Sequence, residues 1–440
     1  MSYYKSILYS IFILIIIFST NTSYSQTTEL RLEEAVKIAL ENNFSIKIAR
    51  SEATIEDNNL TIGNAGFLPS LDVTGRLNRA SQNVQQEFLD GRKVDRDGAK
   101  TSAYEGSLGL NWTVFDGFKM FVNYDRLSDL KDISQLRLKS RVETTIRDVI
   151  NSYFEILRQK LALDVATENL MISRSRYQFV NDRFEVGTAS KIDLLQAGVD
   201  LNTDISDSLD QHIAYDNMKI EFNRLLNRKL DDDFTVVGNI EVNNDYLKNE
   251  IDKVDFNIDI RIADRLVEIN KYDIDALRSE FYPRISLYGI YNYNHQESEA
   301  GFLASSTGNG VNYGVNLSLN LFDGLNTSRQ VENAQVNVEI AEYILRELRL
   351  AVKSAISTSL NGYTKFKELS RFEMENVQAA RENMELAQES LNLGLMSALE
   401  YRETQRRLAN AKLRLITSVY NAKINETELL RLTGSLVKEQ

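Results

Sequence analysis

The sequence lacks cysteine altogether, and its 440 residues include only two prolines, one tryptophan and two histidines. Without cysteine the chain can form no disulfide, thiolate metal site, cysteine nucleophile or lipidated N-terminal cysteine. Average usage would supply about 20 prolines in a chain of this length. This scarcity favours long helices, because an interior proline removes a hydrogen bond and clashes with the preceding turn.

Positive charge is also in short supply, since 51 Lys and Arg face 63 Asp and Glu, for a net charge of −12. We therefore expect no nucleic-acid partner, because contact with phosphates requires a basic surface. No phosphate-binding Gly-Lys motif occurs, so ATP hydrolysis is not expected. No nucleophile–base pair stands out, and the sequence predicts neither an enzyme nor a cofactor or metal site.

The N-terminus has the pattern of a secretory signal peptide, residues 1–25. Lys5 precedes an apolar run from Ile7 to Phe18, and small residues at Ser23 and Ser25 favour cleavage before Gln26. A helix over the apolar run would reach about 18 Å, too short for a hydrocarbon core of about 30 Å. The alternative is an N-terminal membrane anchor. The signal predicts an exported protein.

The rest of the chain contains one unit twice. Pro69 precedes Gly117 by 48 positions and Pro283 precedes Gly324 by 41, so the first copy has seven extra residues there. The landmarks that recur in order are Phe67-Leu68-Pro69 and Phe281-Tyr282-Pro283, Phe115-Asp116-Gly117 and Phe322-Asp323-Gly324, Val186-Gly187 and Leu393-Gly394, and Arg224-Leu225 and Arg431-Leu432. So many ordered matches indicate a duplication.

Each copy is predicted to contain a helix, a β-hairpin, a very long helix and a return helix. Asp116 and Asp323 stand at the N-cap positions of the long helices, which would each extend about 100 Å. The first repeat covers residues 26–230, with the hairpin at about 69–115, the long helix at about 117–186 and the return helix at about 190–228. An acidic linker with a short strand at most follows at 231–255. The second repeat covers 256–436, with these elements at about 283–322, 324–392 and 397–433.

The hairpins alternate apolar and polar residues over four segments of about ten residues, as in transmembrane β-strands. In the last segment Leu317 and Leu319 would face lipid and Asn316 the opposite side. The stretches 80–102 and 296–310 are polar and are predicted to be loops. A soluble sandwich is the alternative. Four strands cannot close a barrel in lipid, where open edges are prohibitive, so several chains would have to contribute.

Over nearly all of residues 29–434 these duplicated landmarks resemble the TolC-like outer-membrane efflux protein family. The resemblance implies a mainly α fold with a transmembrane β-barrel: a homotrimer whose twelve-stranded barrel continues into a periplasmic α-helical barrel. It implies a place in the outer membrane of a Gram-negative bacterium and contact with its lipid. The implied partners are a periplasmic adaptor (membrane fusion) protein and, through it, an inner-membrane pump or ATPase. Phe44 and Ile258 replace a proline that relatives often carry.

The resemblance also suggests functional positions at the periplasmic end. Gly187 and Gly394 would form the tip that contacts the adaptor, although both could be simple helix-capping glycines. Glu400 and Glu403, with Asp193 as the first-copy equivalent, would line the tunnel entrance, and the alternative is a solvated helix face. Crowding in a trimer would raise the pKa of these carboxylates. The aromatic and Arg latch positions of known members fall on Leu391 and Met396.

The predicted function is that of a passive outer-membrane exit duct for a tripartite efflux or type I secretion system. The alternative is a periplasm-spanning coiled-coil or adhesin stalk protein without a pore. In a duct of this kind the pump and adaptor select the cargo, whether drug, metal ion or protein.

Overall fold

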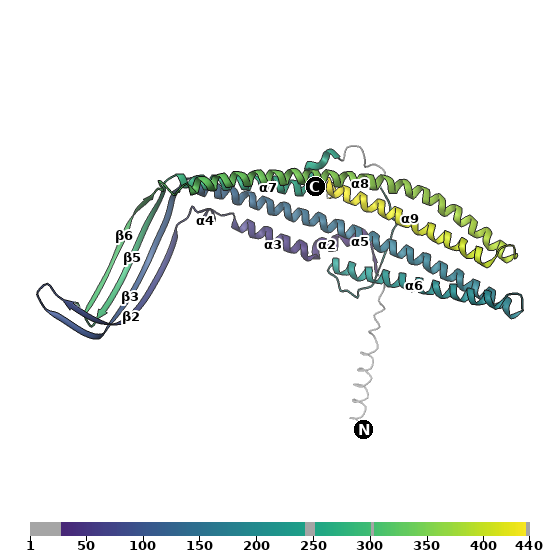
Figure 1. Cartoon of the computed structure of the whole chain (residues 1–440), viewed down its shortest axis with the longest axis horizontal. Coiled ribbons are helices and arrows are strands. Elements are labelled where there is room, and N and C mark those ends of the chain that lie inside the picture. Colours follow the sequence, from purple (N-terminus) through teal and green to yellow (C-terminus); the bar gives the residue numbers. More distant parts are fainter. Residues whose placement is uncertain (1–27, 243–250, 301–302, 437–440) are drawn as a thin grey trace, which may run out of the picture. The chain divides into compact units, whose positions relative to one another are not determined.

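The computed structural model describes residues 28–242, 251–300 and 303–436, so the predicted signal peptide lies outside the described residues. The described chain is mainly helical, and one order of elements occurs twice (Figure 1). In each copy a helical segment leads into two antiparallel strands, a very long helix and a return helix. The expected fold class, mainly α with β-strands, is confirmed.

The first copy begins with strand β1 (Thr28–Leu30). It continues through α2 (Leu32–Asn42), α3 (Phe44–Asn59), α4 (Ile62–Ala65), β2 (Ser70–Glu87), β3 (Lys93–Asp116), α5 (Lys119–Glu185) and α6 (Lys191–Leu225). Strand β4 (Phe234–Val236) and the short helix η1 (Ile251–Phe256) lie between the copies. The second copy contains α7 (Ile258–Arg278), η2 (Ser279–Phe281), β5 (Arg284–Ser298), β6 (Ser305–Ser318), α8 (Asn326–Asn392) and α9 (Ala398–Leu432).

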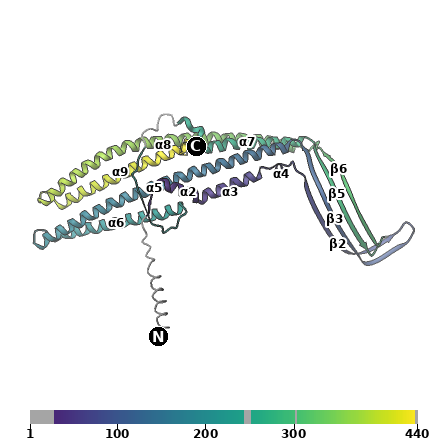
Figure 2. The ribbon, with the colours of Figure 1, turned by 180° about the vertical axis from the view of Figure 1, so that it is seen from behind.

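The chain divides into two compact units. The helical unit comprises the described residues within Met1–Lys47, Val142–Asp252 and Ser354–Gln440, and the sheet unit comprises Ile48–Arg141 and Lys253–Lys353. In the helical unit α6 returns beside α5, and α9 returns beside α8 (Figure 2). Helices α5 and α8 have 67 residues each. Neither contains a proline, so nothing interrupts their hydrogen bonds over about 100 Å. In the described residues no helix is both long and apolar enough to cross a membrane.

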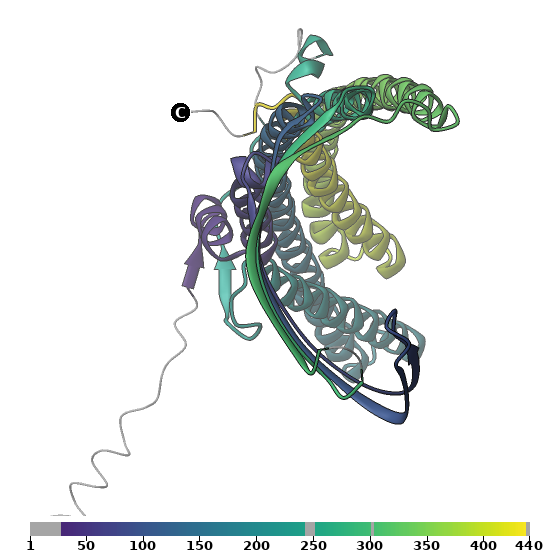
Figure 3. The same cartoon turned by 90° about the vertical axis from the view of Figure 1, so that its left-hand side faces the viewer.

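The sheet unit contains one curved antiparallel sheet with the strand order β2-β3-β5-β6 (Figure 3). In its register Val73 lies opposite Leu108, Leu108 opposite Tyr291 and Tyr291 opposite Val311. Directly paired residues share a face, so this row and its neighbours form an apolar face. The apolar face comprises Leu71, Val73, Leu77, Tyr104, Leu108, Leu110, Trp112, Ile285, Leu287, Tyr291, Tyr293, Val311, Tyr313, Val315 and Leu317. The residues between these positions face the other side of the sheet and are mostly polar.

The strands are longer than predicted, and the prediction of loops at 80–102 and 296–310 is largely wrong. β2 and β3 stay paired as far as Glu87 and Lys93, so only a short turn separates them. Phe88 N–H donates to Arg92 O at 2.8 Å in that turn. The polar sequence did not indicate strands here, because a two-stranded ribbon with both faces in water forms its backbone hydrogen bonds without any alternation of apolar residues. The extra residues of the first copy therefore lengthen strands.

Strand β6 ends earlier than the predicted boundary at 322. Its last residue, Ser318, pairs with Arg284, the first residue of β5. The residues after Ser318 therefore have no strand in the described chain to pair with. Leu319 consequently lies outside the strand, and the prediction that it occupies a strand position is wrong. Leu317 and Asn316 lie on opposite faces of β6, as predicted.

Aspartates stabilise the beginning of both long helices, at the positions the sequence indicated. Met120 N–H donates to Asp116 Oδ1 at 3.2 Å, and Thr327 N–H donates to Asp323 Oδ2 at 2.7 Å. The following Gly117 and Gly324 have φ values of 71° and 73°. At Gly117 a Cβ atom would also meet Ser279 O at 2.3 Å, so the close approach excludes any side chain.

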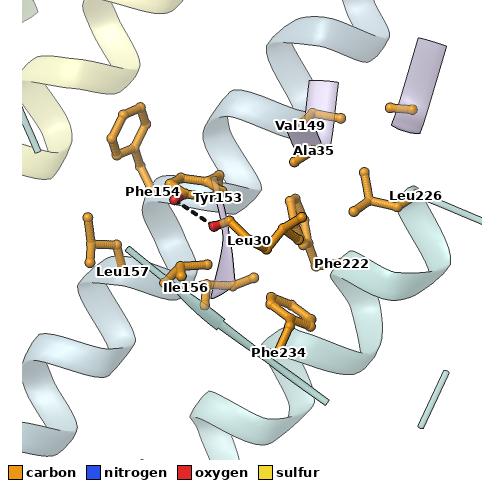
Figure 4. Close-up of a cluster of buried hydrophobic side chains, with 12 residues drawn as sticks. Leu30, Ala35, Val149, Tyr153, Phe154, Ile156, Leu157, Phe222, Leu226 and Phe234 are labelled. Atoms are coloured by element: carbon orange, nitrogen blue, oxygen red, sulfur yellow. Dashed lines mark hydrogen bonds between the residues drawn. The ribbon is translucent and has the colours of Figure 1, made fainter. Parts of the chain in front are cut away.

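The core of the helical unit forms around strands β1 and β4, which pair in parallel (Figure 4). Phe222 of α6 and Phe234 of β4 are both almost fully buried there. Tyr153 of α5 donates its hydroxyl to Leu30 O at 3.0 Å and is also within 2.7 Å of Val237 O. The predicted linker 231–255 therefore begins as part of this core. Its residues 243–250 lie outside the described residues.

Candidate functional site

The two helix-to-helix turns lie at the same end of the helical unit (Figure 1). Gly187 ends α5 with φ 77°, and Gly394 ends α8 with φ 72°. At the first turn Gly187 N–H donates to Phe184 O at 3.0 Å and Thr188 N–H donates to Arg183 O at 2.7 Å, which is a Schellman motif. The second turn repeats these bonds. No atom lies within 4 Å of where a Cβ would stand at either glycine, so both turns are open to a partner.

Both return helices begin with a capping box. Ser190 caps α6, where Asp193 N–H donates to Ser190 Oγ at 3.1 Å and Ser190 N–H donates back to Asp193 Oδ2 at 3.0 Å. Ser397 and Glu400 form the same reciprocal pair at α9, at 3.3 and 3.0 Å. Two of the predicted entrance carboxylates, Asp193 and Glu400, therefore stabilise the helix ends that carry them.

These contacts set the charge of the two carboxylates. Hydrogen bonds from the backbone and hydroxyl of Ser397 hold the pKa of Glu400 below its usual range. The hydroxyl and backbone N–H of Ser190 lower the pKa of Asp193 in the same way. Within one chain this direction is opposite to the upward shift that the sequence suggested, because capping bonds favour the ionised form. Glu403 instead pairs with Arg407 at 3.1 Å on an exposed face.

The two positions that the resemblance suggested for a latch, Leu391 and Met396, are apolar and pack as apolar side chains. Leu391 is buried in a cluster with Met384, Ala387, Tyr401 and Leu408, and Met396 packs against it. Tyr401 of α9 donates its hydroxyl to Gln388 of α8. This cluster joins the two helices of the second copy to each other, and Ile172 of α5 packs against it from the first copy.

A buried polar cluster on the same stretch of α9 also connects the two copies. Arg402 donates to both carboxylate oxygens of Asp204 on α6, at 2.6 and 2.8 Å. Ser173 of α5 donates to the same carboxylate, and Gln405 donates to Asn169 O of α5 at 3.1 Å. The Arg402 and Asp204 side chains are 13% and 7% exposed, so water screens this pair weakly. We call Arg402, Asp204, Ser173 and Gln405 the Arg402 cluster.

A cavity of about 1120 Å³ lies beside the Arg402 cluster, within the helical unit. Helix α6 contributes acidic side chains to its wall and α9 contributes basic ones, including Asp193, Asp200, Asp207, Arg402 and Arg406. Arg176 of α5 pairs with Asp200 at one side of it. Charged side chains of opposite sign therefore face the cavity from the two return helices, among apolar side chains such as Val165 and Leu413.

Sequence reasoning found the turns and caps but missed the Arg402 cluster. A signal was present, since α6 has seven acidic and three basic residues while α9 has four and seven. Opposite net charges on two helices of equal length favour contact between them. The partner residues are nonetheless about 200 positions apart, and no local pattern pairs Arg402 with Asp204.

One face of α6 remains exposed in the described chain. Apolar side chains recur along it three, four, ten and four residues apart, which keeps them on one face of the helix, and each is more than half exposed. We call these residues the α6 seam: Ile192, Leu195, Val199, Leu209 and Ile213. Such spacing is typical of a helix that packs against another helix.

The sequence comparison identifies the family. A model of the outer membrane efflux protein family matches residues 35–226 and 257–435, so the chain belongs to this family. The alkaline protease secretion protein AprF of Pseudomonas aeruginosa is 22% identical over 407 residues, covering 89% of this chain and 82% of the relative. The probable efflux pump outer membrane protein TtgC of Pseudomonas putida is 22% identical over 424 residues, covering 93% and 84%.

Solved structures show the same fold. The Campylobacter jejuni CmeC outer membrane channel superposes with a TM-score of 0.78 at 18% identity, covering 92% of this chain and 86% of that one. The open Neisseria gonorrhoeae MtrE outer membrane channel gives 0.75 at 17% identity, covering 93% and 90%. The expectations of an outer-membrane location in a Gram-negative cell and of an exit duct for efflux or secretion are confirmed. Members of this family are channels rather than enzymes.

Proposed function

We propose that three copies of the chain form a passive, trimeric exit duct in which each contributes four strands to one twelve-stranded barrel. The observation that carries this proposal is the sheet, which has one apolar face and two unpaired edges, β2 and β6, in the described chain. A sheet in lipid cannot leave its edge N–H and C=O groups unpaired. Pairing β2 of one copy with β6 of the next would satisfy both edges.

The α6 seam supports the same assembly on the helical side. Burying one Leu or Ile side chain contributes roughly 1.5–3 kcal/mol, so five such residues on one face favour a helical partner. Three copies would then continue the barrel as a periplasmic α-helical tunnel. Cargo would pass through without any chemical step and without a cofactor.

The partners that we propose are a periplasmic adaptor and, through it, an inner-membrane pump or ATPase. Support comes from the names of the relatives, which belong to an efflux pump and to a protease secretion system. The tip formed by Gly187 and Gly394 is the proposed contact. Its flanking side chains Val186, Leu393 and Leu395 are each more than 70% exposed, as expected of a surface that a partner covers.

We further propose that Asp193, Glu400 and Glu403 line the entrance and that the Arg402 cluster holds it closed. Carboxylates of three copies would concentrate cations at the mouth. The lowered pKa values of Asp193 and Glu400 would keep them ionised in mild acid. The Arg402–Asp204 pair links the second helical hairpin to the first, so releasing it would let the two hairpins separate.

Planar-bilayer conductance of the purified full chain tests these proposals. Detergent-resistant trimers with single-channel conductance support the duct, whereas trimers without conductance support the stalk alternative.

Arg402→Met should raise the open conductance, and Arg381→Met, an exposed change on α8, should not. Glu400→Gln with Glu403→Gln should lower cation preference, and glutamine can still cap α9. An unchanged cation preference would mean that Glu400 and Glu403 lie on a solvated helix face and do not line the entrance.

A further inference from the structure

The apolar face of the sheet extends only part of the way along the strands toward the hairpin turns. Along β5 it runs from Ile285 to His295, whose ring contacts Thr307 and Glu297. Those ten residue steps span about 33 Å along the strand, or about 25 Å in height at a tilt of about 40°. This height equals the apolar band of an outer-membrane barrel, so the rows beyond His295 and Tyr104 would lie at the level of lipid headgroups.

Two cations occupy these rows on the lipid-facing side. Arg79 lies opposite Ser102, and Lys100 lies opposite Ser81, two positions further along each strand. Because Leu77 is paired with Tyr104 in the preceding row, the alternation places Arg79 and Lys100 on the apolar face of the sheet. Such diagonal neighbours are about 7–8 Å apart. Both residues are exposed.

Within the described residues neither cation forms an ion pair with a carboxylate. Among the residues that the structure describes, no carboxylate oxygen lies within 4.0 Å of the Arg79 guanidinium or the Lys100 ammonium. The two nearby glutamates on the β5 side are otherwise engaged. Glu299 Oε2 accepts from the Lys100 backbone N–H at 3.1 Å, and Glu297 lies 3.3 Å from His295 Nε2. Glu297 stands in the same row as Arg79, on the far side of Ser102, whereas β2 itself carries no acidic side chain in these two rows.

We propose that Arg79 and Lys100 bind the phosphate groups of lipopolysaccharide in the outer leaflet. The proposal rests on the proposed barrel, with the β2–β3 turn outside the cell. Two like charges at this spacing repel, and a doubly charged phosphate between them removes that repulsion. The outer leaflet of a Gram-negative cell presents phosphorylated glucosamine headgroups at this depth. The surface would therefore select lipopolysaccharide as its neighbouring lipid.

The test is a titration of the purified full chain in detergent with fluorescent lipopolysaccharide. Replacing both cations, as Arg79→Gln with Lys100→Gln, should weaken the affinity about 30-fold, equivalent to about 2 kcal/mol for two cations at an anionic surface. The matched control is Arg76→Gln, which lies on the polar face of the same strand opposite Glu105 and should bind as the wild type does. Lys100→Gln alone should weaken binding about fivefold, and Lys100→Arg should retain it.

Three outcomes would overturn the proposal. In the first, the wild type and the double variant bind lipopolysaccharide with the same affinity. In the second, Arg76→Gln loses as much affinity as the double variant does. In the third, the wild type binds dephosphorylated lipopolysaccharide or phosphatidylglycerol as tightly as it binds lipopolysaccharide. Conductance of the same preparations separates this proposal from the duct itself. If all variants conduct and bind lipopolysaccharide equally, only the lipid site fails, whereas a wild type that never conducts contradicts the duct.

Discussion

Helices α6 and α9 begin in the same way and end up in different surroundings. Each has 35 residues, a serine N-cap and an acidic residue that completes the capping box. Yet α6 buries only five residues, Leu194, Ala197, Asp204, Phe222 and Asn223, whereas α9 buries twelve. The α6 seam is exposed, while the corresponding part of α9 carries Arg402 and Gln405 into the Arg402 cluster.

This difference shows what duplication preserves. Turns and caps depend on residues within a few positions of one another, so both copies keep them. Burial depends on which helices are neighbours, and the copies differ because α9 contacts α5, α6 and α8 through polar side chains. The exposed apolar face of α6 is the part of this difference that we attribute to the proposed interface between copies.

The largest effect should come from breaking the pair that joins the two helices. Arg402→Met leaves Asp204 buried without its cation and should destabilise the helical unit by about 3–5 kcal/mol. Thermal unfolding followed by circular dichroism measures this loss. The double change Arg402→Met with Asp204→Leu should recover most of it, because no charge then remains buried. Equal losses in both variants would mean that packing, and not charge, is responsible.

Changes in the α6 seam should act on assembly and spare the single chain. Leu195→Gln or Leu209→Gln should each weaken the association of copies by roughly 1.5–3 kcal/mol per buried side chain. The yield of cross-linked trimers in detergent measures the effect. Leu413→Gln in α9 is the matched change and should leave that yield intact. A trimer insensitive to both seam variants would contradict the proposed interface.

The two glycine turns should respond equally, and less strongly. Alanine at Gly187 or Gly394 must adopt a positive φ, which is unfavourable by about 1–2 kcal/mol. Neither site has an atom within 4 Å of the new Cβ, so no clash is added. Hydrogen exchange in the last turns of α5 and α8 should accelerate to the same extent in the two variants. A much larger response at one glycine would reveal a tertiary contact at that turn.

The smallest effect should come from the capping boxes. Ser190→Ala and Ser397→Ala should each destabilise the first turn of the helix by about 1 kcal/mol. Folding lowers the pKa values of Asp193 and Glu400. The stability that the two ionised carboxylates add is therefore fully present above their unfolded pKa values near 4, and it is lost as the pH falls through their lower pKa values in the folded state. Hydrogen exchange across this pH range should show the loss in the wild type. The serine variants should show little pH dependence in the same turns.

Much of the architecture could be read from local pattern. Asp116 and Asp323 cap where the sequence placed them, since a cap requires only an acceptor next to free backbone N–H groups. The polar half of the β2–β3 hairpin could not be recognised as strand, because its pairing is satisfied by the backbone and leaves no mark on side-chain alternation. Phe234 and Val236 lie in the segment predicted to be a linker with a short strand at most, and β4 is that strand. Three residues carry no period, and only pairing with β1 makes them a strand.

The sequence by itself determined the duplication, the two long helices, the glycine turns and the apolar face of the sheet, because each depends on residues close together in the chain. It also led to the prediction that the apolar positions pack against a partner. The tertiary structure decided the rest: that Arg402 meets Asp204, that Glu400 serves its own helix end, and that Arg79 and Lys100 lie together beyond the apolar band. Those arrangements depend on strand register and helix packing between distant segments, which local spacing does not specify.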